Sequence, residues 1–434
     1  MRSTLPQPLA LLLALTGLPG CPKGNPAESD AAAAKPSSST QAQTAPSTSA
    51  APLPSSAKSR ACRVGAPQLV TEGRGGITHA IAANGDAVLV TWGEKRKPGP
   101  NGGSFPEDAT QRFEMARLFD AKTLAPRGAA TVLGSQDAVD AFSNGAAPFA
   151  AADSSLRTAT CAWVAFAGKL SCTFADVAKA TARAKRVNES VPGPGPDGER
   201  IAAVDMGDHA LALLPQCGDL RLVSSTATEM PPLFADPAGG LDGCEPKGKA
   251  DVPALARGGD AAFAVARRGG GLVGRKIVRA APQGPVVQLS ARGLDVGAPA
   301  VVSSAGRASV YYASSSGKAP FALTVTHWAD SGALTRATLA TGSTPAVAPA
   351  VAATIDATCV LLSWTEGSGK ETRVRAGLVC NDALVPSTAI DVSPKDVEAG
   401  DSELATFGGR AFVVWQELPK GRPTELKLAA LSCD

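Results

Sequence analysis

Aromatic side chains are scarce in this chain of 434 residues, where Phe, Trp and Tyr together make up 4%. Basic residues are not clustered at scale, and the formal net charge is only +3. A nucleic-acid-binding surface needs clustered Lys and Arg with interleaved aromatics, so the composition argues against that class of protein. No segment after the N-terminus is apolar for the roughly 18 residues of a transmembrane helix.

Catalytic motifs are also missing. The chain has no Gly-x-Ser-x-Gly elbow, no P-loop, no His-Glu-x-x-His and no dinucleotide-binding fingerprint. Its three histidines, His79, His209 and His327, fall at different places in the repeat described below, so we interpret them as strand or turn residues. The absence of any Cys-x-x-Cys pair argues against zinc. The sequence therefore predicts no catalytic residue, no metal and no cofactor.

The N-terminus has the features of an export signal. Leu9 to Leu18 is an apolar stretch of ten residues, long enough for a signal peptide and too short to span a bilayer. It ends in Leu18-Pro19-Gly20-Cys21, which resembles the lipobox of bacterial lipoproteins; Pro19 departs from the residues usual at its position. The resemblance implies a signal peptide over residues 1–20 and a lipid on Cys21. The alternative is an ordinary cleaved signal and a secreted protein.

Residues 21–60 are interpreted as the lipidated cysteine followed by a disordered tether. Ala, Ser, Pro and Thr dominate this segment, and it has almost no large apolar side chain. Such a chain cannot bury enough surface to offset the entropy of ordering. As a flexible coil it would reach on the order of 35 Å, enough to lift a folded domain over residues 61–434 clear of lipid headgroups.

The rest of the chain repeats with a period near fifty residues. The clearest unit is an apolar strand that ends in Trp92, Trp364 or Trp415. Weaker copies bring the positions that end such a strand to seven, namely 92, 166, 214, 266, 312, 364 and 415. All neighbouring positions are 46 to 52 residues apart except the first two, which are 74 apart. A period near fifty that is built from strands is typical of a propeller.

Each unit has the parts of a four-stranded antiparallel blade. A strand of small residues, such as Pro253–Ala256 or Pro299–Val302, is followed by a turn with Gly and Asp and then by the apolar strand. Residues 61–434 thus resemble an all-β fold, a seven-bladed β-propeller. The last unit stops after three strands, and Gln68–Thr71 looks like an unattached fourth strand. We therefore expect this N-terminal strand to complete the last blade.

Two features mark possible contact surfaces. The wide first spacing is interpreted as an insertion, Gly93 to Arg112, in the central hairpin of the first blade; insertions in repeat proteins map to loops on one face, often the binding face. The tripeptide Trp-x-Glu recurs and places Glu94, Glu366 and Glu417 in three neighbouring blades. These glutamates are either a ligand or cation patch or solvated ends of hairpins.

The nine cysteines are Cys21 and eight others, and an even number in an exported protein predicts disulfides. Two pairs lie symmetrically about a hairpin turn, where cross-strand residues come within disulfide range. Pairing of the first and last strands at the ring closure brings Cys62 next to Cys433. The remaining two, Cys217 and Cys244, belong to one blade. The predicted disulfides are Cys161–Cys172, Cys359–Cys380, Cys62–Cys433 and Cys217–Cys244.

Two classes of function follow. The first is a monomeric, envelope-anchored propeller on the periplasmic or surface face, which binds or scaffolds protein or glycan partners and contacts the membrane only through its lipid. The second is a propeller enzyme of glycosidase or lyase type that uses loop carboxylates. The missing motifs favour the first, although fold alone is weak ground for either.

Overall fold

The structure is a computed structural model, and the chain divides into two compact units, residues 1–56 and 57–434. All described residues belong to the second unit. They span 60–433 without the segments 74–77, 97–110, 136–140, 165–168, 178–184, 191–199, 217–218, 228, 235–250, 269–270, 305, 316–320, 343–350 and 355–357. The signal peptide, Cys21, the tether up to residue 59 and the pair Cys217 and Cys244 therefore lie outside the described residues.

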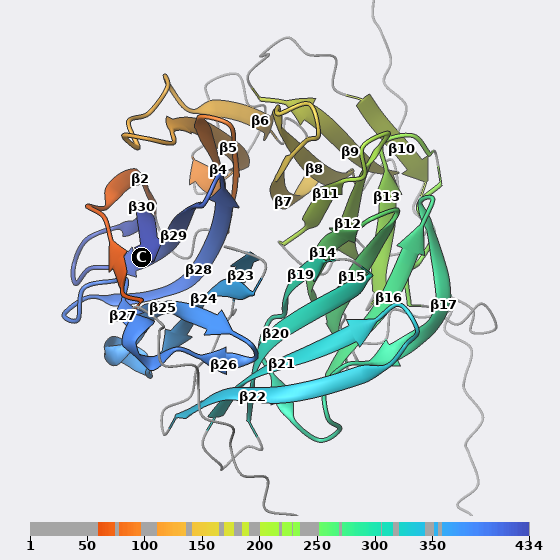
Figure 1. Cartoon of the computed structure of the whole chain (residues 1–434). Helices are drawn as coiled ribbons and strands as arrows, with labels where there is room; N and C mark the ends of the chain where they lie inside the picture. Colours follow the sequence, from red (N-terminus) through yellow and green to blue (C-terminus); the bar gives the residue numbers. More distant parts are fainter. Residues whose placement is uncertain are drawn as a thin grey trace, which may run out of the picture. The chain divides into compact units, whose positions relative to one another are not determined.

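The described residues form seven antiparallel sheets, which we call blades 1 to 7 (Figure 1). Blade 1 consists of β3 (His79–Asn84), β4 (Ala87–Arg96), β5 (Gln111–Asp120) and β6 (Thr131–Ser135). Blade 2 consists of β7 (Ala141–Ala150), β8 (Leu156–Val164), β9 (Lys169–Asp176) and β10 (Lys185–Ser190). The described part of blade 3 consists of β11 (Ala202–Asp205), β12 (Ala210–Gln216) and β13 (Asp219–Ser224).

The next blades repeat the pattern. Blade 4 consists of β14 (Asp251–Gly258), β15 (Ala261–Arg268), β16 (Gly271–Val278) and β17 (Ala281–Gln288). Blade 5 has β18 (Asp295–Val296) and β19 (Ala300–Ser304), which both pair with β20 (Arg307–Ser315), then β21 (Phe321–Ala329) and β22 (Leu334–Gly342). Blade 6 has β23 (Val351–Thr354), β24 (Cys359–Glu366), β25 (Arg373–Cys380), β26 (Ala383–Leu384) and β27 (Ile390–Asp391), with short 3-10 helices η2 (Gly369–Glu371) and η3 (Pro386–Thr388).

Blade 7 combines both ends of the folded unit. It consists of β28 (Glu398–Phe407), β29 (Arg410–Leu418) and β30 (Thr424–Cys433), with β1 (Cys62–Val64) and β2 (Gln68–Gly73) both paired to β30. The N-terminal segment thus completes the last blade, as the repeat pattern predicts. Closure leaves no unpaired edge on β30, which protects the seam from fraying and aggregation.

The innermost strands close a ring. In cyclic order β3, β7, β11, β14, β19, β23 and β28 each contact the next, and β28 contacts β3 again (Figure 1). The seven-bladed β-propeller expected from the sequence is therefore confirmed. Small residues dominate these inner strands because seven backbones converge there. No helix in the described part of the chain is long and apolar enough to cross a membrane.

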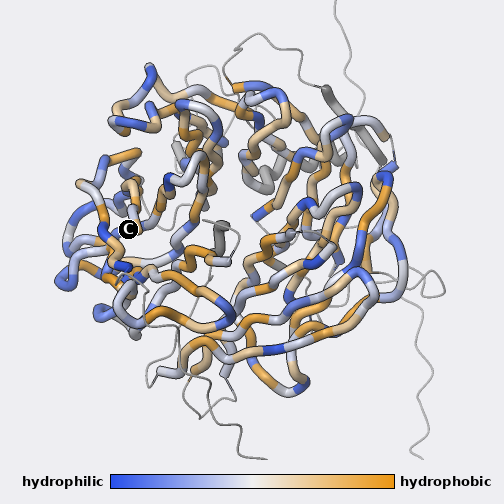
Figure 2. The backbone as a smooth tube through the Cα atoms, in the orientation of Figure 1, coloured by the Kyte–Doolittle hydropathy of each residue, from blue (hydrophilic) through white to orange (hydrophobic). Residues whose placement is uncertain are grey.

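The core lies between the blades. Seven apolar clusters, one for each pair of neighbouring blades, hold most of the buried side chains. Alternation along a strand sends successive side chains to opposite neighbours: Trp415 packs against blade 6, whereas Val414 packs against blade 1. In Figure 2 apolar residues follow the strands, and hydrophilic residues gather at the turns on the rim.

Three disulfides are present among the described residues. Cys161–Cys172 and Cys359–Cys380 join cross-strand partners in blades 2 and 6. Cys62–Cys433 joins β1 to β30, again directly opposite each other. These three pairings are confirmed, and Cys217–Cys244 stays a prediction.

One boundary needs correction. The ladder between β4 and β5 continues past Gly93 and reaches Arg96 opposite Gln111. The insertion is therefore shorter than residues 93–112, because polar residues at the outer end of a hairpin pair as well as apolar ones. The remaining insertion, residues 97–110, lies outside the described residues.

Candidate functional site: a charged pocket on the ring axis

A pocket opens on the axis where the innermost strands begin. Its volume is about 240 Å³, and its wall comes from blades 1 to 5 and blade 7, mainly from their inner strands. Ala, Pro, Val and Leu side chains and backbone make up most of this wall. Because those side chains are small, the axis stays open at this end.

An ion pair spans the pocket. Arg200, just before β11 in blade 3, reaches Glu403 of β28 in blade 7, with Nη1 and Oε1 3.3 Å apart. Its Nη2 lies 3.6 Å from Oδ1 of Asp401. Blades 3 and 7 are not neighbours in the ring, so these side chains meet across the axis. Arg200 and Glu403 are each only 23% exposed.

Bulges shape three of the inner strands at this level. In β7, β14 and β28 the register slips by one residue, between Ser143 and Ala146, Asp251 and Ala254, and Gly400 and Glu403. Each slip contains a residue with positive φ, and these are Gly145, Val252 and Asp401. Positive φ is costly for a branched side chain such as Val252. Bulges re-aim side chains near sites of function, and here one of them turns Asp401 and Glu403 toward Arg200.

Burial inside the ring governs the charge of Glu403. It raises the pKa of Glu403 to about 7, and repulsion from Asp401 acts in the same direction while Arg200 opposes it. Near neutral pH this side chain therefore exists in both protonation states. A carboxyl group in that condition both donates and accepts hydrogen bonds and can also exchange protons with a ligand.

Two more polar side chains line the pocket on the blade 1 side. Glu114 of β5 is 2% exposed and His79 of β3 is 5% exposed. Trp92, the cross-strand partner of His79, also lines the pocket, but it is 2% exposed and packs in the core between blades 1 and 7. The two glutamates of the pocket, Glu114 and Glu403, outnumber its one arginine, Arg200, and small apolar residues surround all three.

The predicted glutamates do not gather in this pocket. Glu366 and Glu417 accept hydrogen bonds from the indole of the tryptophan two residues earlier, at 3.3 and 2.9 Å. Glu366 also pairs with Arg375 at 3.0 Å; burial raises its pKa, but the hydrogen bond and charge of Arg375 outweigh burial, and the net shift is downward. Glu94 sits opposite Phe113 in its own blade.

The three glutamates therefore end equivalent strands in separate blades. Among the described residues, no group of three or more His, Cys, Asp or Glu is arranged to hold a metal ion. Glu94, Glu366 and Glu417 thus belong to no metal-holding group in the described part of the chain, and their role as a ligand patch stays a prediction.

The histidines occupy strand and turn positions, as expected. His209 lies next to a turn, and its Nδ1 is 2.6 Å from Oδ1 of Asp208. His327 lies in β21 and is 6% exposed. Its Nδ1 lies 2.8 Å from Ser309 Oγ in the same blade, and its Nε2 lies 2.8 Å from Asp382 Oδ1 in blade 6. These hydrogen bonds join neighbouring blades, and Ser309 is itself buried.

Arg200, Asp401, Glu403 and Glu114 were not singled out from the sequence. A signal for two of them does exist. Aligned by repeat, the inner strands read mainly Ala, Pro and Val, and Arg200 and Glu403 break that pattern. A charge at a crowded axial position is costly unless it is paired, so such an exception indicates a site.

Comparison with known proteins gives similarity of fold only. No family model matches the chain, and no curated protein sequence matches it. A crystal structure of a Dyadobacter fermentans protein of unknown function aligns with a TM-score of 0.52 at 12% identity, over 86% of this chain and 99% of that one. The chain is thus a seven-bladed β-propeller with a charged axial pocket.

Two other solved structures align less well. The polysaccharide lyase Uly1 has a TM-score of 0.48 at 8% identity, with 84% of this chain and 90% of that chain covered. The Trypanosoma rangeli sialidase in complex with the inhibitor DANA has a TM-score of 0.42 at 9% identity, with 83% and 55% covered. Similarity at this level carries no argument about function.

Proposed function

We propose that this protein is a binding module of the cell envelope, held by a lipid on Cys21, and that its axial pocket takes one sugar unit. The observation that carries the proposal is the meeting of Arg200 with Glu403 and Asp401 across the axis. The planar guanidinium of Arg200 offers paired hydrogen-bond donors, and the neighbouring carboxyl groups of Glu403 and Asp401 offer paired acceptors. Adjacent hydroxyl groups on a sugar ring match such pairs, because each hydroxyl both donates and accepts.

Size and charge restrict the ligand further. A volume of about 240 Å³ lies just below the range of typical ligand pockets, which measure about 300–1,000 Å³. It suits a single ring or the end of a glycan rather than an internal stretch of polymer. Because acidic groups outnumber Arg200 in the pocket, a strongly anionic ligand is disfavoured.

The envelope location rests on different observations. Three disulfides fit an oxidising compartment, and the Leu18-Pro19-Gly20-Cys21 segment resembles a lipobox. The tether would then hold the ring at a distance from the membrane surface.

Titration calorimetry with a panel of neutral, amino and acidic monosaccharides tests the binding function on the full-length protein. Arg200→Met should weaken binding of the preferred sugar at least tenfold, because it removes charged hydrogen bonds from a partly buried site. Arg127→Met is the matched control, since Arg127 forms a comparable network with Asp86 and Asp120 elsewhere. Equal loss in both variants, or none in either, would contradict the axial site.

A glycosidase or lyase is the second candidate, and the environment of Glu403 is what favours it. A carboxyl group with a pKa near 7 is suited to general acid or base catalysis at neutral pH. The two candidates separate on Glu403→Gln. For an enzyme this variant would bind sugar but stop releasing product, whereas for a binding module no product forms even with the wild-type protein.

A further inference from the structure

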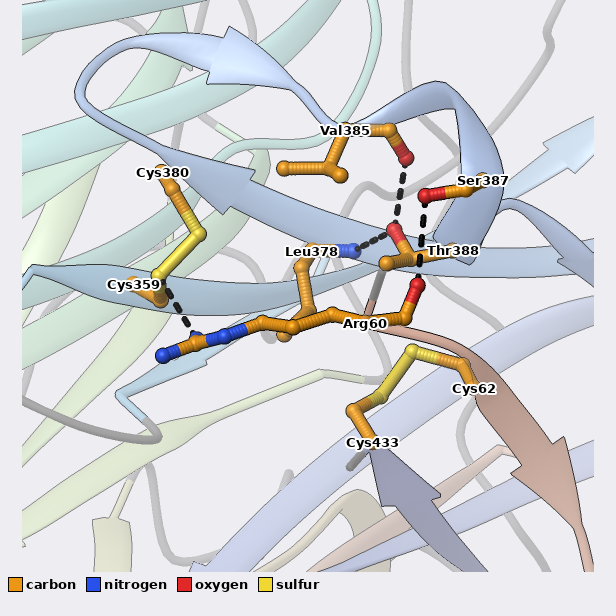
Figure 3. Close-up of a disulfide and its surroundings, with 9 residues drawn as sticks. All are labelled: Arg60, Cys62, Cys359, Leu378, Cys380, Val385, Ser387, Thr388 and Cys433. Atoms are coloured by element: carbon orange, nitrogen blue, oxygen red, sulfur yellow. Dashed lines mark hydrogen bonds between the residues drawn. A yellow bond between two sulfur atoms is a disulfide. The ribbon is translucent and has the colours of Figure 1, made fainter. Parts of the chain in front are cut away.

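One sulfur of the Cys359–Cys380 disulfide lies beside a positive charge. Nη1 of Arg60 donates a hydrogen bond to Cys359 Sγ at 3.1 Å (Figure 3). The Thr358 hydroxyl, 3.7 Å from the same sulfur, is also a donor, because a disulfide sulfur carries no hydrogen. Two donors therefore converge on the Cys359 side of the bond.

Arg60 is fixed in this position by the ring seam. Its carbonyl oxygen accepts a hydrogen bond from Ser387 Oγ at 3.1 Å. Two residues later the chain is covalently bound through Cys62 to Cys433 (Figure 3). The guanidinium is thus held over blade 6 by two restraints on the C-terminal side of its own residue, and it is preorganised for a charge on Cys359.

The two cysteines also differ in access. Cys359 is 3% exposed, whereas Cys380 is only partly buried. An attacking thiolate therefore meets Cys380 first, and Cys359 becomes the leaving group. Leaving is faster when the departing thiolate is stabilised, as it is next to a cation.

We propose that Cys359–Cys380 is a thiol–disulfide exchange site for a dithiol, with Cys380 attacked and Cys359 as the leaving thiolate. The incoming thiolate bonds to Cys380 Sγ, and the electron pair of the broken S–S bond goes to Cys359 beside Arg60 and Thr358. The second thiol of the reductant then attacks the mixed disulfide and releases Cys380. Two electrons pass in total: the dithiol becomes a disulfide, and its two protons are shared between solvent and the two new thiols.

Cys161–Cys172 is a natural control within the same protein. It too joins directly opposed residues of the second and third strands of a blade. Its cysteines are 2% and 0% exposed, and among the described residues no hydrogen bond reaches either sulfur. It has the same topology without the access and, in the part of the chain that the structure describes, without the hydrogen-bonded cation, so it should resist a dithiol.

The test uses the full-length oxidised protein with dithiothreitol at pH 7, quenched over time by alkylation and read by peptide mass spectrometry. Cys359 and Cys380 should be alkylated well before Cys161 and Cys172. Arg60→Met should slow this reduction about tenfold, the factor expected for losing a hydrogen bond to a developing charge, whereas Arg60→Lys should retain part of the rate. Glutathione, a monothiol, should be trapped as a mixed disulfide on Cys380.

Three results would overturn the proposal. These are equal rates for the two hairpin disulfides, a mixed disulfide on Cys359, and an unchanged rate in Arg60→Met. Fraying of the seam in Arg60→Met would instead speed reduction, and would expose Cys62 and Cys433 to alkylation; that acceleration also contradicts a leaving-group role. Arg60 is exposed and lies before the first strand, so its variants are expected to fold.

Discussion

The Cys62–Cys433 bond should contribute more stability than any other described disulfide, because it closes the longest loop. Its two cysteines are 371 residues apart, against 11 for Cys161–Cys172. In the chain-entropy model these loops correspond to about 6 and about 3 kcal/mol of unfolding free energy. The difference of about 3 kcal/mol depends only on the ratio of the loop lengths.

The comparison uses two double variants, Cys62→Ala with Cys433→Ala and Cys161→Ala with Cys172→Ala. The second pair is fully buried, so alanine adds a cavity cost of about 1 kcal/mol there. The seam variant should still be less stable by about 2 kcal/mol. Urea unfolding, followed in parallel by tryptophan fluorescence and circular dichroism, measures both and tests for two-state behaviour.

Equal losses in the two variants would refute this reasoning. In that case the pairing of β1 and β2 with β30 would hold the ring closed without the disulfide. Removing the disulfide would then add little conformational entropy to the unfolded chain. A second probe is hydrogen exchange along β30, which should accelerate in the seam variant and stay unchanged in the hairpin variant.

Two further predictions concern the pocket and the anchor. Because the pKa of Glu403 is raised from 4.5 to about 7 in the folded state, its protonation stabilises the fold fully below about pH 4.5, and this contribution is lost as pH rises through 7. Glu403→Gln should therefore gain stability relative to wild type between pH 5 and pH 8, by at most about 3 kcal/mol in urea unfolding; a difference that is constant with pH would contradict the buried carboxyl. Cys21→Ala should move the protein from the membrane fraction to the soluble fraction, and a variant that stays with the membrane would rule out lipid on Cys21.

Sequence reasoning recovered the features that depend on local period and strand register. A repeat near fifty residues set the number of blades, because each repeat must pair its own strands before it packs on a neighbour. Cysteines symmetric about a turn, such as Cys359 and Cys380, face each other in any antiparallel hairpin. The Cys62–Cys433 bond followed in the same way once Gln68–Thr71 was assigned to the last blade.

Which residues meet in the axial site was decided by the tertiary structure. Arg200 and Glu403 are 203 residues apart and belong to blades that are not neighbours, so no local pattern relates them. Their contact depends on ring closure, on the small side chains around the axis, and on the bulge that turns Asp401 and Glu403 inward. Glu94, Glu366 and Glu417 show the reverse case. Their repeated tripeptide is plain in the sequence, yet in the described part of the chain they belong to no metal-holding group, because equivalent positions in a ring are spread around the axis.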